Sequence, residues 1–296
     1  MTLLALTMAL AAFIGISLGM LGGGGSILAV PLLVYVAGLP AKEAIATSLF
    51  LVAITSATAL VPHARAGRVR WRTGVMFGLA GMVGAYAGGR LAAFVPDGVL
   101  LGAFALMMLA TAAAMVRGRR GVADRRKPVR LPMLRAVVDG AAVGLVTGLV
   151  GAGGGFLVVP ALVLLGGLPM PAAVGTSLVV IAMKSAAALA GYLSVVDVHW
   201  GLAAAVTAAA VVGSLIGGRL VGVLREEVLR AAFGWFVLVM GVVVFAAQLP
   251  GDLRANPWLW STLGLAGLTA AVGTLRTKRW AVRSGRGRLP HDQSPQ

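Results

Sequence analysis

The 296-residue sequence contains no cysteine, only 9 acidic residues and little charge of any kind. The absence of cysteine excludes a disulfide framework and a thiolate metal site. Charged residues make up 11% of the chain, whereas a soluble domain carries about 25%. Hydrophobic residues make up 59%, so the polar residues are too few to cover a surface that faces water. Since a membrane span needs about 20 apolar residues, we predict an all-α, polytopic protein of the lipid bilayer with roughly ten apolar segments.

The positive charge lies between and after the apolar segments. A net charge of +16 in a soluble protein would suggest nucleic-acid binding, but basic loops of this kind are typical of membrane topology determinants, and we expect no nucleic-acid partner. Placing the basic loop 117–135 in the cytoplasm puts the Arg-rich loop 63–72 on the same side. The loop with Arg225 and Arg230 and the tail from Arg276 also fall there. This orientation satisfies the positive-inside rule.

The apolar N-terminal stretch 1–20 has two interpretations. It could be a signal peptide, but it lacks the basic n-region that such peptides carry. The internal repeat described next also begins inside it. We therefore treat this stretch as part of the mature structure.

Two blocks of the sequence match without a gap when the chain is shifted by 129 residues, the separation of Gly19 and Gly148. About half of positions 19–49 are identical to their partners, and Trp71 meets Trp200 much later at the same shift. Shared low complexity could produce the first match but hardly the second. We therefore predict a duplicated architecture.

Each half contains five apolar segments, and the second of them is short. The segments are 3–21, 26–38, 44–62, 73–94 and 98–116 in the first half, and 134–150, 156–168, 172–195, 201–223 and 229–249 in the second; 257–275 is an eleventh candidate. The second segment, of about 13 residues, gives roughly 20 Å of helix, less than the roughly 30 Å hydrocarbon core. We therefore expect each half to hold a glycine-rich bent helical hairpin, with its turn inside the membrane, plus about three full spans.

These segments predict five regions along the chain. They are a first membrane repeat at 1–116, a basic cytoplasmic linker at 117–133, a second membrane repeat at 134–250, an extra C-terminal span at 251–275 and a basic cytoplasmic tail at 276–296.

The two repeats are expected to have inverted topology. Between a residue and its partner 129 positions later, the chain crosses the membrane an odd number of times if each hairpin crosses it twice or not at all. Loop 63–72 carries four Arg, whereas its partner 192–201 has none and contains Asp197, and inversion predicts such an opposite charge bias. If each hairpin counts as one crossing, the halves are parallel and the charge difference is left unexplained.

The paired short segments are the best sequence pointer to a transporter's substrate site. A break at mid-depth leaves backbone N–H groups without partners, and an anion can satisfy them at the positive end of a helix. The glycines could instead only allow close helix packing, which is the interpretation we favour for the G-x-x-x-G motifs at Gly84/Gly88 and Gly213/Gly217. The candidate substrate-binding residues in the two glycine stretches are Gly22, Gly23, Gly24, Gly25, Ser26, Gly151, Gly153, Gly154 and Gly155.

Hydroxyl groups and one lysine complete the candidate site. Thr47-Ser48 and Thr176-Ser177 begin the third segment of each half, where their hydroxyls could donate to a substrate oxygen or bond back to their own helix. Lys184 lies within an apolar segment, where an ionisable group is by default functional. It could hold an anion or exchange a proton during transport; the alternative is a scaffold lysine that reaches water. Arg90 and Arg219 lie near segment ends, where snorkelling is easy.

No motif predicts an enzyme, a metal site or a cofactor. The glycine run 151–155 resembles a dinucleotide loop but lacks the strand, turn and helix context. The three histidines are scattered and form no metal-binding pattern. Trp71 and Trp200 lie beside loop boundaries, as interfacial anchors do. We therefore predict a protein that is not an enzyme and needs no cofactor.

The two glycine clusters, Gly19-Met20-Leu21-Gly22-Gly23-Gly24-Gly25-Ser26 with Pro31 and Gly148-Leu149-Val150-Gly151-Ala152-Gly153-Gly154-Gly155 with Pro160, are each followed by Thr-Ser-Leu. This pattern resembles the sulfite exporter TauE/SafE family over nearly the whole chain to about residue 250. The resemblance implies a multi-pass permease of the bacterial inner (plasma) membrane for sulfite, sulfonates or related small anions. Family members commonly have seven or eight spans, and bent hairpins would account for the larger number of segments here.

The leading hypothesis is therefore a secondary transporter of a small anion. Its site would lie near the midplane between the two hairpins, and rocking of the halves would give alternating access. A non-transporting membrane assembly partner and a passive anion channel are the alternatives. We expect no buried Asp or Glu that would mark a proton or sodium path, and no oligomeric state follows from the sequence.

Overall fold

The computed structural model describes residues 2–21, 26–116, 133–151, 158–159, 162, 168–220, 238–239 and 241–248. None of these residues lies in a β-strand, so the described part of the chain is all-helical. The central linker, the extra span at 257–275 and the basic tail lie outside the described residues, as does most of the predicted segment 156–168.

The helices follow the predicted apolar segments to within a few residues. They are α1 (Thr2–Leu21), α2 (Ala29–Pro31) with the π-helical turn η2 (Leu32–Val36), α3 (Ala41–Arg65), α4 (Trp71–Leu91) with the 3-10 turn η3 (Ala92–Phe94), α5 (Asp97–Val116), α6 (Met133–Val150), α8 (Met170–Tyr192) and α9 (Trp200–Leu220). Pro40 and Pro169 are the N-cap residues of α3 and α8 and have extended backbone, as residues directly before a first helical turn do. The short segment predicted at 26–38 in the first half is confirmed as helical over residues 26–36.

Within the described residues, four helices are long and apolar enough to cross a bilayer: Ala41–Arg65, Trp71–Phe94, Pro171–Tyr192 and Trp200–Arg219. Large apolar side chains also point outward, among them Val83, Phe94 and Leu106. Apolar side chains at such exposed positions fit contact with lipid rather than with water. The chain is therefore a polytopic, membrane-embedded helical protein.

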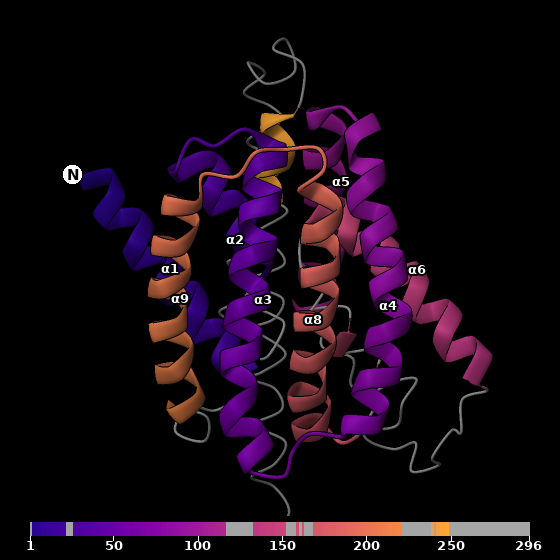
Figure 1. Ribbon diagram of the computed structural model, residues 1–296. Coiled ribbons are helices and arrows are strands. Elements are labelled where there is room, and N and C mark those ends of the chain that lie inside the picture. The colour runs from indigo at the N-terminus through magenta and orange to yellow at the C-terminus, as the bar shows by residue number, and fades with distance from the viewer. Residues whose placement is uncertain are drawn as a thin grey trace, which may run out of the picture.

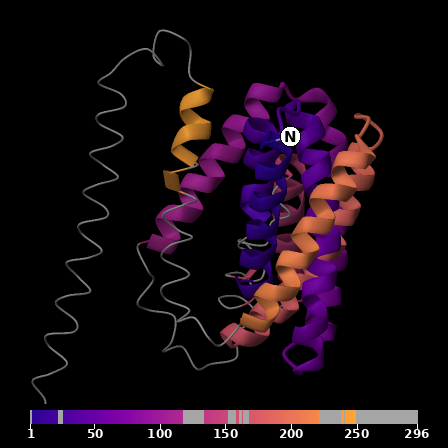
Figure 2. The ribbon, with the colours of Figure 1, turned by 90° about the vertical axis from the view of Figure 1, so that its left-hand side faces the viewer.

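The helices pack as two bundles that each mix the two halves of the sequence. Figure 1 shows α9, α3, α8 and α4 side by side, with α1 crossing α9 and α6 crossing α4. One bundle contains α1, α3 and α9, the other contains α4, α6 and α8, and α3 packs on α8 to join them. Figure 2 shows the described helical stretch 241–247 beside α5, where a Cβ atom added at Gly241 would lie 3.2 Å from Met108 Cβ.

Glycines set the two crossing contacts. A Cβ atom at Gly84 would overlap the carbonyl of Ala141 on α6, and one at Gly213 would overlap the carbonyl of Ala12 on α1. The second glycine of each G-x-x-x-G motif makes the equivalent contact one turn further on. Each contact in one bundle matches a contact in the other at the 129-residue shift. The packing interpretation of these motifs is confirmed.

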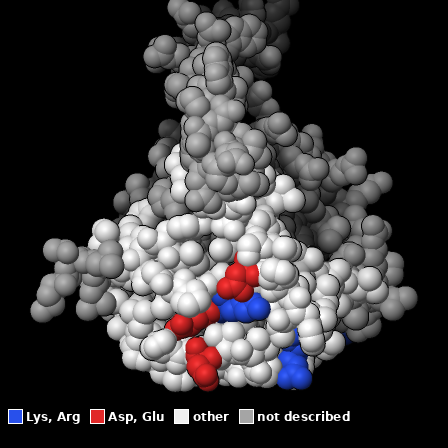
Figure 3. Space-filling view, turned by 90° about the horizontal axis from the view of Figure 1, so that it is seen from above, with Lys and Arg blue, Asp and Glu red and all other residues white. Residues whose placement is uncertain are grey.

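Equivalent helices of the two halves run in opposite directions. The α3–α4 connection lies at the lower end of Figure 1, whereas the α8–α9 connection lies at the upper end. Arg65, Arg68, Arg70 and Arg72 lie at or beside the α3–α4 connection. Figure 3 shows the upper end, where acidic side chains gather. The described part of the molecule therefore has a basic end and a mixed, more acidic end.

Candidate functional site

The helix α6 stops at a buried glycine. Gly151 follows the last helical residue, Val150, and has a φ of +73°, the left-handed conformation that favours glycine after a helix. Its N–H donates to the carbonyl of Thr147 at 3.0 Å. Both Val150 and Gly151 are buried, so the carbonyl end of α6 needs partners from the protein itself.

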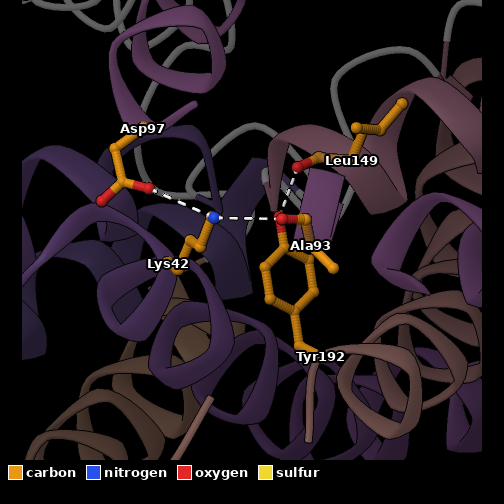
Figure 4. A network of polar contacts seen from close by, with 5 residues as sticks. All are labelled: Lys42, Ala93, Asp97, Leu149 and Tyr192. Carbon is orange, nitrogen blue, oxygen red and sulfur yellow. Dashed lines mark hydrogen bonds and ion pairs between the residues drawn. The ribbon is translucent and has the colours of Figure 1, made fainter. Parts of the chain in front are cut away.

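Two side chains from the central helices supply these partners. The Tyr192 hydroxyl on α8 donates to the carbonyl of Leu149 at 2.5 Å (Figure 4). The Ser48 hydroxyl on α3 donates to the carbonyl of Gly151 at 2.9 Å and to that of Ile45 at 2.7 Å. The end of α6 is therefore held from both sides, and Ser48 is a predicted site residue that reaches the glycine stretch.

Lys184 on α8 contacts α6 at Thr147, which lies one helical turn before the end of α6. Its side chain is 1% exposed, and its Nζ donates to Thr147 Oγ1 at 3.1 Å. The Thr147 hydroxyl donates in turn to the carbonyl of Val143 at 2.7 Å. No carboxylate among the described side chains forms an ion pair with Lys184. The Lys184 side chain is therefore buried rather than snorkelling, and its Nζ lies near the negative end of the α6 dipole.

The end of α1 has a different partner. The ring nitrogen Nε2 of His63 lies 3.5 Å from the carbonyl oxygen of Gly19, in the last turn of α1. His63 is buried, and within the described residues its other ring nitrogen has no hydrogen-bond partner. His63 and Tyr192 occupy equivalent positions at the 129-residue shift. Neither residue is among the predicted site residues, although a polar pair at matched positions is a signal that the sequence contains.

The short helical stretch 26–36 begins deep in the protein. Ser26 is fully buried, and Val36 precedes the turn into α3. Eleven residues of α-helix cover about 16 Å, a little under half of the length of α3, which is about 37 Å. Gly22 to Gly25, predicted to bind substrate, lie outside the described residues, as do Gly153 to Gly155.

The remaining predicted hydroxyls separate in the structure. Thr176 Oγ1 accepts a hydrogen bond from the backbone N–H of Arg70 at 3.0 Å, beside the start of α4. Ser177 donates to the carbonyl of Val174 at 2.7 Å, one turn back in its own helix. Thr47 is buried, and its hydroxyl has no partner among the described residues. The described residues thus bring Ser48, Gly151 and Lys184 to the end of α6 and place Thr176 at the basic end.

The upper end carries two ion pairs outside this site. Lys42 Nζ lies 3.6 Å from Asp97 Oδ1 and donates to the carbonyl of Ala93 at 3.4 Å (Figure 4). Glu43 pairs with His199 Nδ1 and also accepts from the His199 backbone N–H at 3.4 Å, which ties α3 to the start of α9. No group of three or more potential metal ligands occurs among the described residues.

Arg90 and Arg219 are exposed near the ends of α4 and α9. These positions agree with snorkelling side chains.

Comparison with known proteins identifies the family. The sulfite exporter TauE/SafE family matches residues 7–244. A probable membrane transporter protein of Xylella fastidiosa (strain Temecula1) is 34% identical over 239 residues, covering 80% of this chain and 90% of the relative. The probable membrane transporter protein YdhB of Bacillus subtilis is 27% identical over 235 residues, covering 78% and 96%. No solved structure matches the chain significantly. The chain belongs to the sulfite exporter TauE/SafE family of membrane transporters.

Proposed function

We propose that this transporter moves a small anion, such as sulfite, a sulfonate or a related sulfur-containing or organic anion, by alternating access. The anion binds near mid-depth between the two glycine-rich hairpins, at the start of the short helix of each half. The observation that carries the proposal is the fully buried start of the 26–36 stretch, at Ser26, after α1 has stopped at Leu21. N–H groups at such a helix start attract an anion.

The two hairpins belong to inverted repeats in this proposal. Three observations support it: equivalent helices run in opposite directions, the α1–α9 crossing matches the α6–α4 crossing, and the glycine contacts agree at the 129-residue shift. Inverted repeats place substrate sites at the repeat interface. The basic end of the bundle faces the cytoplasm of a bacterial inner membrane, following the positive-inside rule.

The moving bodies are the two mixed bundles. The sequence favoured rocking of its two halves, but α1 packs on α9 and α4 packs on α6, so each half contributes to both bundles. A half cannot move as a unit without separating these close glycine contacts. The bundle α1, α3, α9 therefore rocks against the bundle α4, α6, α8 along the α3–α8 contact.

Lys184 supplies positive charge to the site of the second half. Its buried ammonium group has no carboxylate partner among the described residues, so an incoming anion would gain an ion pair without displacing an acid. A buried, unpaired charge is costly, and a bound anion reduces that cost.

Flux into liposomes that contain the purified protein tests the proposal. Saturable counterflow of sulfite, methanesulfonate or acetate is expected. Gly24→Leu and Gly153→Leu should abolish it while membrane insertion persists, and Lys184→Ala should weaken anion affinity. Flux without counterflow indicates a channel, and absence of flux for every anion indicates a non-transporting partner; either result overturns the proposal.

A further inference from the structure

Two buried serines on the central helices have no hydrogen-bond partner among the described residues. Ser56 on α3 is 0% exposed and Ser185 on α8 is 1% exposed. They are equivalent at the 129-residue shift. Most other helical hydroxyls with described partners bond back to their own helix, as Thr55 does to the carbonyl of Leu51 at 2.5 Å. The two matched serines both lack such a bond to their own helix.

Leaving a hydroxyl unpaired in the protein interior has a cost. The loss of its bonds to water is not recovered, whereas alanine at the same place would carry no such penalty. The same unpaired hydroxyl is present at both equivalent positions. This points to a hydrogen-bond partner that comes from outside the described residues. A transported oxyanion is such a partner, because its oxygens accept hydrogen bonds from hydroxyl groups.

Both serines lie on the helix faces that line the main core. Ser56 lies between Val52 and Ala59 along α3, and Ser185 between Ile181 and Ala188 along α8; these four neighbours belong to one buried cluster. The cluster also contains residues 27–30 of the short helix, directly after Ser26. The serines and the start of the short helix therefore belong to the same buried core.

The serines lie on either side of mid-depth. Each is about 22 Å along its helix from the N-terminal end, counting 15 residues at 1.5 Å. Because α3 and α8 run in opposite directions, one hydroxyl lies slightly below the centre of the bundle and the other slightly above it.

We propose that Ser56 and Ser185 are substrate-binding residues, whose hydroxyls donate to the oxygens of the transported anion from α3 and α8. This inference rests on the proposed transport function and adds two residues to its site. The ligand class is an oxyanion such as sulfite, a sulfonate or a carboxylate. One donor on each bundle keeps the anion in contact with both bundles as they rock.

The first test compares Ser56→Ala and Ser185→Ala with Thr55→Val, which removes a neighbouring hydroxyl that is already bonded within its helix. Wild-type binding and counterflow of sulfite are measured first, and their absence would defeat transport rather than this inference. Each serine variant should raise the KM for sulfite about tenfold, the loss of one hydrogen bond to a charged group. The Thr55→Val variant should keep the wild-type KM.

Thermal unfolding without anion separates a binding role from a structural one. Both alanine variants should melt at the wild-type temperature or above it, because an unpaired hydroxyl has been removed. A clear fall in melting temperature, or an unchanged KM for sulfite, overturns the inference.

A labelling experiment uses the absence of native cysteine. Ser56→Cys and Ser185→Cys should react with a small anionic methanethiosulfonate reagent in membranes, and methanesulfonate should slow the reaction. Ala59→Cys, one turn from Ser56 within the buried core, serves as the matched control and should react more slowly. No labelling at either serine position, or labelling that methanesulfonate does not slow, contradicts a position in the anion path.

Discussion

The carbonyl ends of α1 and α6 are equivalent in sequence but are held differently. At α6, Tyr192 bonds Leu149 at 2.5 Å and Ser48 bonds Gly151 at 2.9 Å. At α1, the described contact is that of His63 with Gly19 at 3.5 Å. The packing of the same two helices is closely matched, since both cross their partners through glycines. The two halves of the chain thus share backbone packing at these crossings and differ in the polar groups at the helix ends.

This difference has a physical basis. Helix crossings that depend on glycine tolerate little change, because any side chain there overlaps a backbone carbonyl. The polar partners of a helix end can change more easily, since imidazole and phenol both donate to a carbonyl. Of the two ends, α6 has the shorter bonds and the buried cation. We expect the end of α6 to be the more firmly held.

The largest effect should come from breaking the shared packing. Gly84→Leu and Gly213→Leu each place a side chain into the backbone of the crossing helix, so each should destabilise the fold by about 3 kcal/mol or more. The measurement is the yield of monodisperse protein and its thermal unfolding in detergent. Equal losses support matched crossings, whereas loss at one site only would break the comparison.

The control for these variants is Gly102→Ala on α5. A Cβ atom at Gly102 meets no atom within 4 Å, and alanine favours helix more than glycine does. The melting temperature should therefore stay the same or rise slightly.

The next largest effect concerns the buried cation of the α6 end. Thr147→Val removes the hydroxyl that accepts from Lys184, and the unpaired ammonium should reduce the free energy of unfolding by about 2 kcal/mol. In a Lys184→Met background the same change should cost less than about 1 kcal/mol, since no charge is left unpaired. Equal costs in the two backgrounds would show that the Lys184–Thr147 contact carries no energy.

Much of this architecture could be predicted from the sequence. Apolar length and proline placement gave the helices to within a few residues, and the shortness of 26–36 was visible from Pro40 and the glycine run. The packing role of the G-x-x-x-G motifs also followed, because small residues spaced by four lie on one helix face. These features depend on local sequence and composition.

The polar partners could not be predicted in the same way. Ser48 meets Gly151 from the other half of the chain, and Lys184 meets Thr147 on another helix, so both contacts depend on how helices cross. The mixed bundles were equally hidden, because periodicity does not say which helices pair. The scattered histidines predict no metal site, but His63 and its shift partner Tyr192 form a matched pair of donors that the sequence does contain.

A smaller effect should separate the two helix ends directly. Tyr192→Phe removes the donor to Leu149 and should cost about 1 kcal/mol, the usual value of one hydrogen bond. His63→Phe removes a longer contact and should cost less. Chemical denaturation in mixed micelles measures both. A larger loss at His63 would reverse the ranking of the two ends.

The smallest effect should come from the ion pair at the upper end, near Tyr192. Lys42 and Asp97 lie 3.6 Å apart, and the Asp97 side chain is 49% exposed, so water and salt screen their attraction. Asp97→Asn should therefore change the free energy of unfolding by less than about 1 kcal/mol. The difference from the wild type should shrink at high salt, because screening removes the attraction that the variant lacks. A large loss of unfolding free energy that persists in high salt would mean that Asp97 supports the α6 end structurally. The contacts at the upper end would then also contribute to the difference between the α1 and α6 ends.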